Sequence, residues 1–275
     1  MTNAQLVLVV AAIVIAFPVG SFTNVIIDRL PLPFDEPNKF GELYGTRPWA
    51  EVLGGRSRCS SCGEPVRPVD NIPIVSWLLL KGKCRACGER IPAFHLVVEA
   101  AVPGLVALCM WVAGISAQLP MLFWLIPFGV AVAVIDARTL IVPTKLVWPA
   151  FAVSIVIAVV VALTHDHPRW LLGGLVGLAT LAGPLFLAWF AHPRGMGFGD
   201  VRLSAVLGWH VGFAAAVAGG TLTASAFMAL ICMVLASFSG IVYGLAAVGM
   251  ARHLPFGPSL VAGAIATCAI AERFL

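Results

Sequence analysis

The chain has 275 residues, of which 60% are hydrophobic and 11% are charged, and its mean hydropathy is +0.98. A soluble domain carries about 25% charged residues, so this composition excludes a water-soluble globular protein and indicates a polytopic membrane protein. The net charge of +4 is small and dispersed, does not indicate nucleic-acid binding, and fits the excess of Lys and Arg in cytoplasmic loops.

Eight apolar runs predict an all-α fold of about eight transmembrane helices. Most runs are close to the ~20 residues that a helix needs to cross the hydrocarbon. They cover residues 6–27, 94–115, 119–135, 146–163, 170–190, 201–219, 223–250 and 255–270. The first run has no positive residue before it and no small-residue cleavage site, so we expect a retained helix rather than a signal peptide. The predicted domains are a first transmembrane helix (1–27), a polar module (28–92) and a seven-helix membrane domain (93–275).

The segment 28–92 carries most of the charge. It holds 10 of the 17 Lys and Arg residues and 8 of the 13 Asp and Glu residues. It is also rich in Pro and Gly and shows no long helical period. We therefore expect a small, water-exposed unit that is rich in loops or in β-structure.

Two CxxC pairs stand in this module. Cys59 and Cys62 are followed, after 21 residues, by Cys84 and Cys87, a spacing typical of a zinc ribbon in which four thiolates surround one Zn²⁺. A module with few large apolar side chains gains much of its folding free energy from such a metal. Four thiolates leave no open position for water, which indicates a structural ion. Two disulfides are the alternative, and they need an oxidising compartment.

The basic residues of the loops predict the topology. With the N-terminus outside, the module and three further loops lie in the cytoplasm. Those loops and the adjoining helix ends carry Arg138, Lys145, Arg194, Arg202 and Arg252, whereas Arg169 and Arg273 lie outside. This distribution obeys the positive-inside rule. It places the C-terminus outside and the four module cysteines in reducing cytoplasm, which favours zinc over disulfides.

Two isolated acids fall on the cytoplasmic face in this topology. Asp136 ends the third run and Asp200 begins the sixth, and Asp166, in an outside loop, is the only other acid between residues 100 and 271. An acid at the edge of a bilayer is costly and is a functional-site hypothesis by default. Two carboxylates at helix ends on one face can meet in a helix bundle.

The third run is short. Residues 121–135 span about 22 Å as a helix, less than the ~30 Å of hydrocarbon. Either this mismatch draws Asp136 into the interface, or Leu119 and Pro120 complete an ordinary span. After Asp136 we expect an exposed turn over residues 137–143.

The stretch GMGFGD at residues 195–200 places alternating glycines before Asp200. Glycine lets another chain approach closely, so Gly197 and Gly199 admit an extended substrate backbone beside the carboxylate. Two carboxylates that share a site do not both ionise readily, so one stays protonated and the other acts as a base. Such a pair can activate water against a peptide carbonyl and protonate the leaving amine. The structural alternatives are two helix caps, or ion pairs with neighbouring arginines.

Several motifs in one order resemble the type IV prepilin peptidases, which are leader peptidases and N-methyltransferases of the GxGD aspartyl protease class. The motifs are GSFTNVIIDRLP at 20–31, the two CxxC pairs around NIPIVSW at 71–77, Asp136 with Ile141 and Pro143, GFGDVRL at 197–203 and LPFGP at 254–258. The resemblance therefore covers nearly the whole chain. Two departures are Arg202, where many members have Lys, and residues 91–99, which retain Glu99 but not the usual Arg-Tyr-Pro.

The resemblance implies a function in some detail. Asp136 and Asp200 would be the catalytic aspartates, and the substrate would be a prepilin or a pilin-like secretion subunit cleaved at the cytoplasmic face of the bacterial inner membrane. The new N-terminal residue would then be methylated with S-adenosylmethionine as the donor. No Rossmann glycine fingerprint occurs in 28–92, so no cofactor-binding residues are assigned.

Two other functions stay open from the sequence. One is a non-enzymatic membrane assembly or transport component that docks through a zinc-ribbon module, in which both aspartates are dispensable. The other is a peptidase without methyltransferase activity. In all three cases the partners are a protein and membrane lipid, not nucleic acid.

Overall fold

A computed structural model describes residues 2–31, 46–193, 195–247 and 255–275. Arg194, Arg252 and Leu254, which figure in the predicted topology and motifs, lie outside the described residues, as does the whole segment 32–45. The chain forms two compact units, Met1–Ala107 and Leu108–Leu275.

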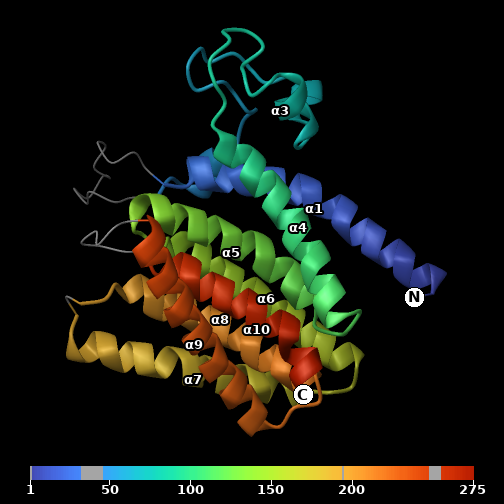
Figure 1. Cartoon of the computed structure of the whole chain (residues 1–275), viewed down its shortest axis with the longest axis vertical. Helices are drawn as coiled ribbons and strands as arrows, with labels where there is room; N and C mark the ends of the chain where they lie inside the picture. Colours follow the sequence, from blue (N-terminus) through green and yellow to red (C-terminus); the bar gives the residue numbers. More distant parts are fainter. Residues whose placement is uncertain (1, 32–45, 194, 248–254) are drawn as a thin grey trace. The chain divides into compact units, whose positions relative to one another are not determined.

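Each predicted apolar run corresponds to one long helix (Figure 1). These helices are α1 (Asn3–Arg29), α4 (Ala93–Ala113), α5 (Leu119–Thr139), α6 (Thr144–Thr164), α7 (Trp170–Ala191), α8 (Phe198–Val217), α9 (Leu222–Ala247) and α10 (Gly257–Phe274). The all-α membrane fold is therefore confirmed. Three short helices, α2 (Trp49–Leu53), η1 (Pro68–Asn71) and α3 (Val75–Leu79), lie between α1 and α4.

Within the described residues, six helices are long and apolar enough to cross a membrane: α1, α4, α5, α6, α7 and the first 21 residues of α9. The helices α8 and α10 reach 20 and 18 residues but are not among the six. Most of their residues are buried against other helices, among them glycines, serines and alanines. A helix surrounded by protein does not need the hydropathy of one that faces lipid.

The third predicted span is of ordinary length. Leu119 begins α5 and Pro120 occupies its first turn, where a missing N–H is tolerated, so the helix has 21 residues. The exposed turn expected directly after Asp136 was placed wrongly, because the helix continues to Thr139. It ends where Leu140 adopts a left-handed φ of 56° and its N–H bonds the carbonyl of Asp136.

The first unit combines α1 and part of α4 with the polar module. A Cβ on Gly20 would lie 3.3 Å from the Cα of Glu99, so the glycine permits close approach of α1 and α4. The Asn24 amide donates to the carbonyl of His95 across the same contact, at 3.0 Å. In its described residues the module has only isolated β-bridges and short helices, so the loop-rich form of the prediction is confirmed.

The second unit is a helix bundle with α8 inside it. The pair α7 and α8 is in close contact through glycines. A Cβ on Gly177 would lie 2.6 Å from the Cα of Gly212, and a Cβ on Gly208 would lie 2.9 Å from the Cα of Leu178. Small residues at such contacts let backbones approach where lipid offers no hydrophobic drive for association.

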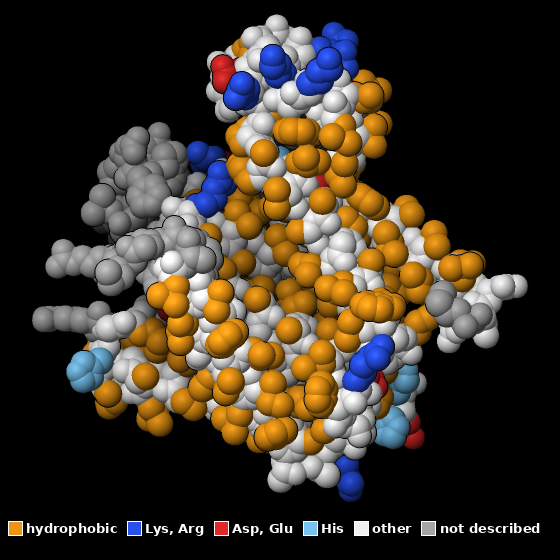
Figure 2. Space-filling view, viewed as in Figure 1, with side chains coloured by type: hydrophobic (Ala, Val, Ile, Leu, Met, Phe, Trp, Pro, Cys, Tyr) orange, Lys and Arg blue, Asp and Glu red, His pale blue; other side chains and the backbone are white. Residues whose placement is uncertain are grey.

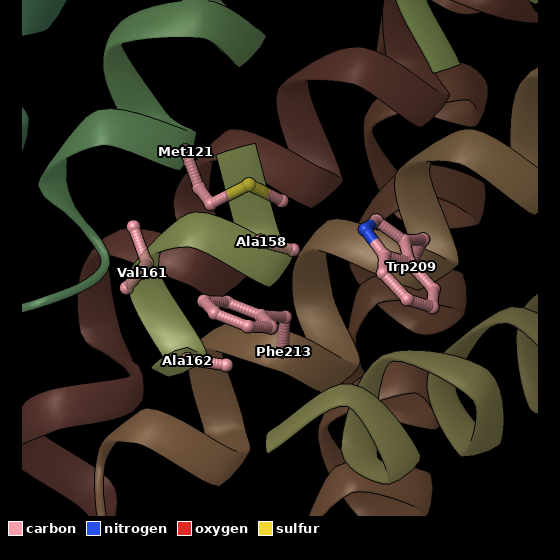
Figure 3. Close-up of a cluster of buried hydrophobic side chains, with 6 residues drawn as sticks. All are labelled: Met121, Ala158, Val161, Ala162, Trp209 and Phe213. Atoms are coloured by element: carbon pink, nitrogen blue, oxygen red, sulfur yellow. The ribbon is translucent and has the colours of Figure 1, made fainter. Parts of the chain in front are cut away.

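A second contact within this unit is made by large side chains (Figure 3). Met121 from α5, Val161 with two alanines from α6, and Trp209 and Phe213 from α8 form one buried cluster. The α5 residue lies in the first turn of its helix, so this cluster holds α5 and α8 together at the end of α5 away from Asp136.

Candidate active site and metal centre

Asp136 lies on the last full turn of α5 and is only 4% exposed. Its Oδ2 accepts a hydrogen bond of 2.8 Å from the backbone N–H of Gly257. Gly257 is the first residue of α10, so the N–H that it donates is one that a helix leaves without an internal partner. The positive end of the helix dipole points at the same carboxylate.

The identity of Gly257 follows from this contact. A Cβ at this position would lie 2.7 Å from Oδ2 of Asp136 and 3.1 Å from its Cγ, closer than real Cβ atoms approach. Any other side chain would therefore displace the carboxyl group or the start of α10. Glycine is required here by close approach, and the backbone lies directly against the acid.

Asp200 lies in the first turn of α8, and its side chain is half-buried. The N-cap residue is Gly197, with no side-chain hydrogen bond, so Asp200 does not occupy the cap position as the structural alternative required. The carboxyl groups of Asp200 and Asp136 interact electrostatically. Two acids separated by 64 positions in the chain are thus brought together by α5 and α8.

The two glycines before Asp200 have different surroundings. Gly197 is exposed, and the nearest atom to an added Cβ there is Oδ2 of Asp200 at 3.7 Å, an ordinary contact distance. At Gly199 an added Cβ would lie 2.9 Å from the Cβ of Val142, a buried residue between α5 and α6. Gly199 therefore packs the start of α8 against that connection, whereas Gly197 is exposed next to the acid.

Arg202 lies two positions after Asp200, in the first part of α8. Its guanidinium donates to Thr144 Oγ1 at the start of α6 and lies 5.4 Å from the centroid of the Phe198 ring. These contacts tie the first turn of α8 to α6. They give Arg202 a place in the packing around Asp200, which the sequence had offered only as a candidate ion-pair partner.

The four module cysteines converge on one point. The sulfur atoms of Cys59, Cys62, Cys84 and Cys87 all lie within 4.8 Å of one another, and all four thiols are free. The Cys59 and Cys87 sulfurs are 3.8 Å apart. Zn–S bonds of about 2.3 Å in a tetrahedron place sulfurs about 3.8 Å apart, whereas a disulfide joins them at about 2.05 Å. The donor set therefore fits one tetrahedral metal ion.

Both CxxC pairs are built by the same turn. The N–H of Cys59 bonds the carbonyl of Glu64, and the N–H of Cys84 bonds the carbonyl of Glu89. Gly63 and Gly88 each donate back to the first cysteine of their pair, with φ of 71° and 73°. An added Cβ would meet nothing at either glycine, so the left-handed backbone alone explains the residue type.

The surroundings of Cys59 and Cys87 shift their thiol pKa values in opposite directions. The backbone N–H groups of Cys62 and Ser61 lower the pKa of Cys59 to about 6. At Cys87 the backbone of Glu89 acts in the same direction, but desolvation and the three neighbouring thiols raise its pKa to about 12.

Comparison with known proteins identifies the family of the chain. Residues 14–113 match the Bacterial Peptidase A24 N-terminal domain, and residues 123–245 match the Type IV leader peptidase family. A protein of Dichelobacter nodosus named prepilin leader peptidase/N-methyltransferase is 31% identical over 88% of this chain and 84% of its own length. The chain belongs to the type IV leader peptidase family.

Further relatives of the family carry the same name. One from Bacillus subtilis is 33% identical over 78% of this chain and 81% of its own length, and one from Stutzerimonas stutzeri is 31% identical over 76% and 74%. No solved structure matches the chain. Membership makes the protein a multi-pass membrane peptidase with methyltransferase activity, and the non-enzymatic alternative is not favoured.

The two family segments carry different sites. The N-terminal segment contains the four cysteines and ends in α4, whereas the second segment contains Asp136 and Asp200. Gly257, which bonds Asp136, lies beyond both segments. The sequence had assigned no role to this residue. The available signal was a glycine between two prolines at the start of an apolar run, which indicates a specific backbone requirement.

Residues 91–99 differ from the usual family pattern but keep Glu99. The side chain of Glu99 has a defined partner. Its Oε2 accepts a 2.7 Å hydrogen bond from the backbone N–H of Ile74, a β-branched residue with a φ of 63°. A left-handed backbone at such a residue is unfavourable and persists only where its surroundings hold it. Glu99 therefore fixes the turn between η1 and α3.

Proposed function

We propose that this protein removes the leader peptide of type IV prepilins or pilin-like secretion subunits, with Asp136 and Asp200 as the catalytic pair. The observation that carries the proposal is the interaction of two acids from α5 and α8 at the start of α10. Buried acids in a membrane bundle are retained for function by default. The family membership supplies the substrate class.

The contacts of the two acids suggest different roles. Asp136 accepts the Gly257 N–H, which orients its carboxyl group, and we assign it the role of base. Asp136 then takes a proton from the attacking water, whose oxygen bonds the scissile carbonyl carbon. Asp200 is the protonated partner that donates to the leaving amine as the peptide bond breaks. The exposed Gly197 admits the extended substrate backbone beside Asp200.

The same protein methylates the new N-terminal residue, with S-adenosylmethionine as the proposed donor. Gly54 and Gly55 are the only paired glycines of the module's described residues, but Gly54 ends α2 by bonding the carbonyl of Ala50. This pair therefore does not form a nucleoside cradle. We assign no residue to the donor and derive no step through it.

The four cysteines are proposed to hold one Zn²⁺ with a structural role, because all four positions of a tetrahedral ion are filled by thiolates. The proposed orientation has both termini outside and the module and both aspartates at the cytoplasmic face. The Lys and Arg distribution of the loops supports this orientation.

The peptidase proposal is tested by replacing each acid without changing its size. Asp136→Asn and Asp200→Asn are each expected to reduce leader removal by about 10²–10⁴-fold, because a general acid or base contributes about that factor. The measurement is the intact mass of a co-expressed prepilin, which also reports the added methyl group. Membrane levels of each variant must match those of the wild type.

Asp166→Asn is the matched control, because this exposed acid lies in a loop away from the pair and asparagine tolerates its left-handed φ of 57°. It should process the prepilin at the wild-type rate. Normal processing by either Asp136→Asn or Asp200→Asn would contradict the proposal. A processed but unmethylated product from the wild type would identify a peptidase without methyltransferase activity.

A further inference from the structure

The short helix α3 has an inverted distribution of polar and apolar side chains. Ser76 is 6% exposed and is held by hydrogen bonds with the backbone of Val69 and Ile72. On the outer face Leu78 is 57% exposed and Leu79 is 78% exposed. A unit surrounded by water is expected to bury its leucines and expose its serine.

The exposed apolar residues form a defined surface. Val75, Leu78 and Leu79 are spaced i, i+3 and i+4, so they share one face of α3. Val69 and Ile72, in and next to the preceding η1, are also exposed. We call these five residues the α3 apolar surface. Figure 2 shows hydrophobic and basic side chains together on the part of the molecule that carries α3.

The contact between Ile74 and Glu99 determines the level of this surface along α4. Glu99 is the seventh residue of α4, which places it about 9 Å along the axis from Ala93. The polar headgroup layer of a bilayer is only about 5–7 Å thick on each side. Because Ile74 bonds Glu99 directly, α3 begins beside the first two turns of a helix whose length and composition suit a membrane span.

The helix α1 packs against α4 at the same position along the α4 axis. Gly20 lies against Glu99 and is nine residues from the end of α1 at Arg29. Gly20 and Glu99 both lie within helices whose length and composition suit a membrane span. Exposed apolar side chains of α1 and α4, among them Phe22 and Val97, belong to the same unit as the α3 apolar surface.

The charges that follow α3 fit a lipid surface. Lys81 and Lys83 are exposed directly after the last turn of α3. Long basic side chains reach from an apolar surface to anionic headgroups, and each contributes to binding a negatively charged leaflet. Apolar residues on one side and lysines at the edge are the arrangement of an interfacial helix.

We propose that the α3 apolar surface inserts into the headgroup–acyl boundary of the adjoining leaflet, with Lys81 and Lys83 on anionic lipid headgroups. The module is thereby held against the bilayer at a third point, besides α1 and α4. This inference does not depend on the peptidase chemistry.

Photo-crosslinking in bilayers of phosphatidylglycerol and phosphatidylcholine tests the insertion. A photoreactive phenylalanine analogue replaces Leu79 in the full chain, and the same analogue replaces Glu64, an exposed residue of the first CxxC turn, as the control. Intact mass is expected to show a several-fold excess of lipid adduct at position 79. Metal content equal to the wild type shows that each variant is folded.

Equal lipid labelling at the two positions would overturn the proposal, and so would an adduct at position 79 with a prepilin or with a second copy of the chain. The charge component is tested by Lys81→Gln with Lys83→Gln in the chain labelled at position 79. The share of phosphatidylglycerol among the lipid adducts should fall several-fold while the total stays high. An unchanged share would overturn the headgroup contact.

Discussion

The four thiols and the two carboxylates are assembled over very different distances along the chain. Each CxxC turn is closed by backbone hydrogen bonds within six residues, and the two turns are the same. The acid site needs α5, α8 and the start of α10: Asp136 lies 64 positions from Asp200 and 121 positions from Gly257, whose N–H it accepts. The difference teaches that the metal centre depends on local turns and an ion, whereas the acid pair depends on helix packing.

Loss of the metal should produce the largest effect, and it should be confined to the module. In Cys62→Ser the site loses one of four ligands. Binding of structural zinc contributes about 10–16 kcal/mol in small domains, so the module is expected to unfold. Metal content and proteolysis within residues 46–92 measure this, while thermal unfolding of the helices α5 to α10 should be unchanged.

Cys268→Ala is the control for this variant, because it removes a buried thiol in α10 that lies far from the module in sequence. It should retain the full metal content. Metal retained by Cys62→Ser, or lost from Cys268→Ala, would contradict the assignment of the four module cysteines.

The contact between Asp136 and α10 is tested by adding one methyl group at Gly257. In Gly257→Ala the added Cβ would lie 2.7 Å from Oδ2 of Asp136, so the carboxyl group or the start of α10 must shift. Displacement of a catalytic group by about 1 Å can reduce a rate by about 10²-fold, so leader removal should fall by about that factor. The measurement is kcat on a purified prepilin, together with thermal unfolding.

Gly263→Ala separates this effect from general overpacking in the same helix. Its added Cβ would lie 2.9 Å from the carbonyl of Cys232 in α9 and far from the acid pair along α10. It should lower the unfolding temperature without reducing kcat in the folded fraction. An equal loss of kcat in both variants would show that Gly257 acts only through stability.

The glycine contact between α7 and α8 should give a smaller effect, on stability alone. In Gly177→Ala the new methyl group meets the backbone of α8, and overpacking of this kind destabilises by about 1–3 kcal/mol. Gly183→Ala is the control, because nothing lies within 4 Å of a Cβ there. Thermal unfolding should separate the two variants, and metal content should be normal in both. Equal unfolding temperatures would contradict the close contact of the two helices.

Much of the architecture was predictable, because each membrane helix is visible in the sequence as a long run of apolar residues. All eight apolar runs became helices, since backbone groups in lipid must bond within their own segment. The exposed turn after Asp136 was misplaced, because a left-handed Leu140 ends α5 and a hydropathy boundary does not reveal that residue. Likewise the hydropathy of α8 did not show that the helix would be surrounded by others.

The cysteine spacing was sufficient by itself to predict a metal site, because a CxxC followed by glycine closes its turn with bonds to its nearest neighbours. Topology placed Asp136 and Asp200 on one face, but it did not reveal Gly257, which contacts Asp136 across 121 positions. It also did not reveal the partner of Glu99, or that Ser76 would be buried while Leu79 is exposed. The contacts of Asp136 and Glu99 join residues distant in the chain, and only the packing of the folded chain brings them together. Ser76 instead bonds Val69 and Ile72 nearby, and the turn between η1 and α3 decides its burial.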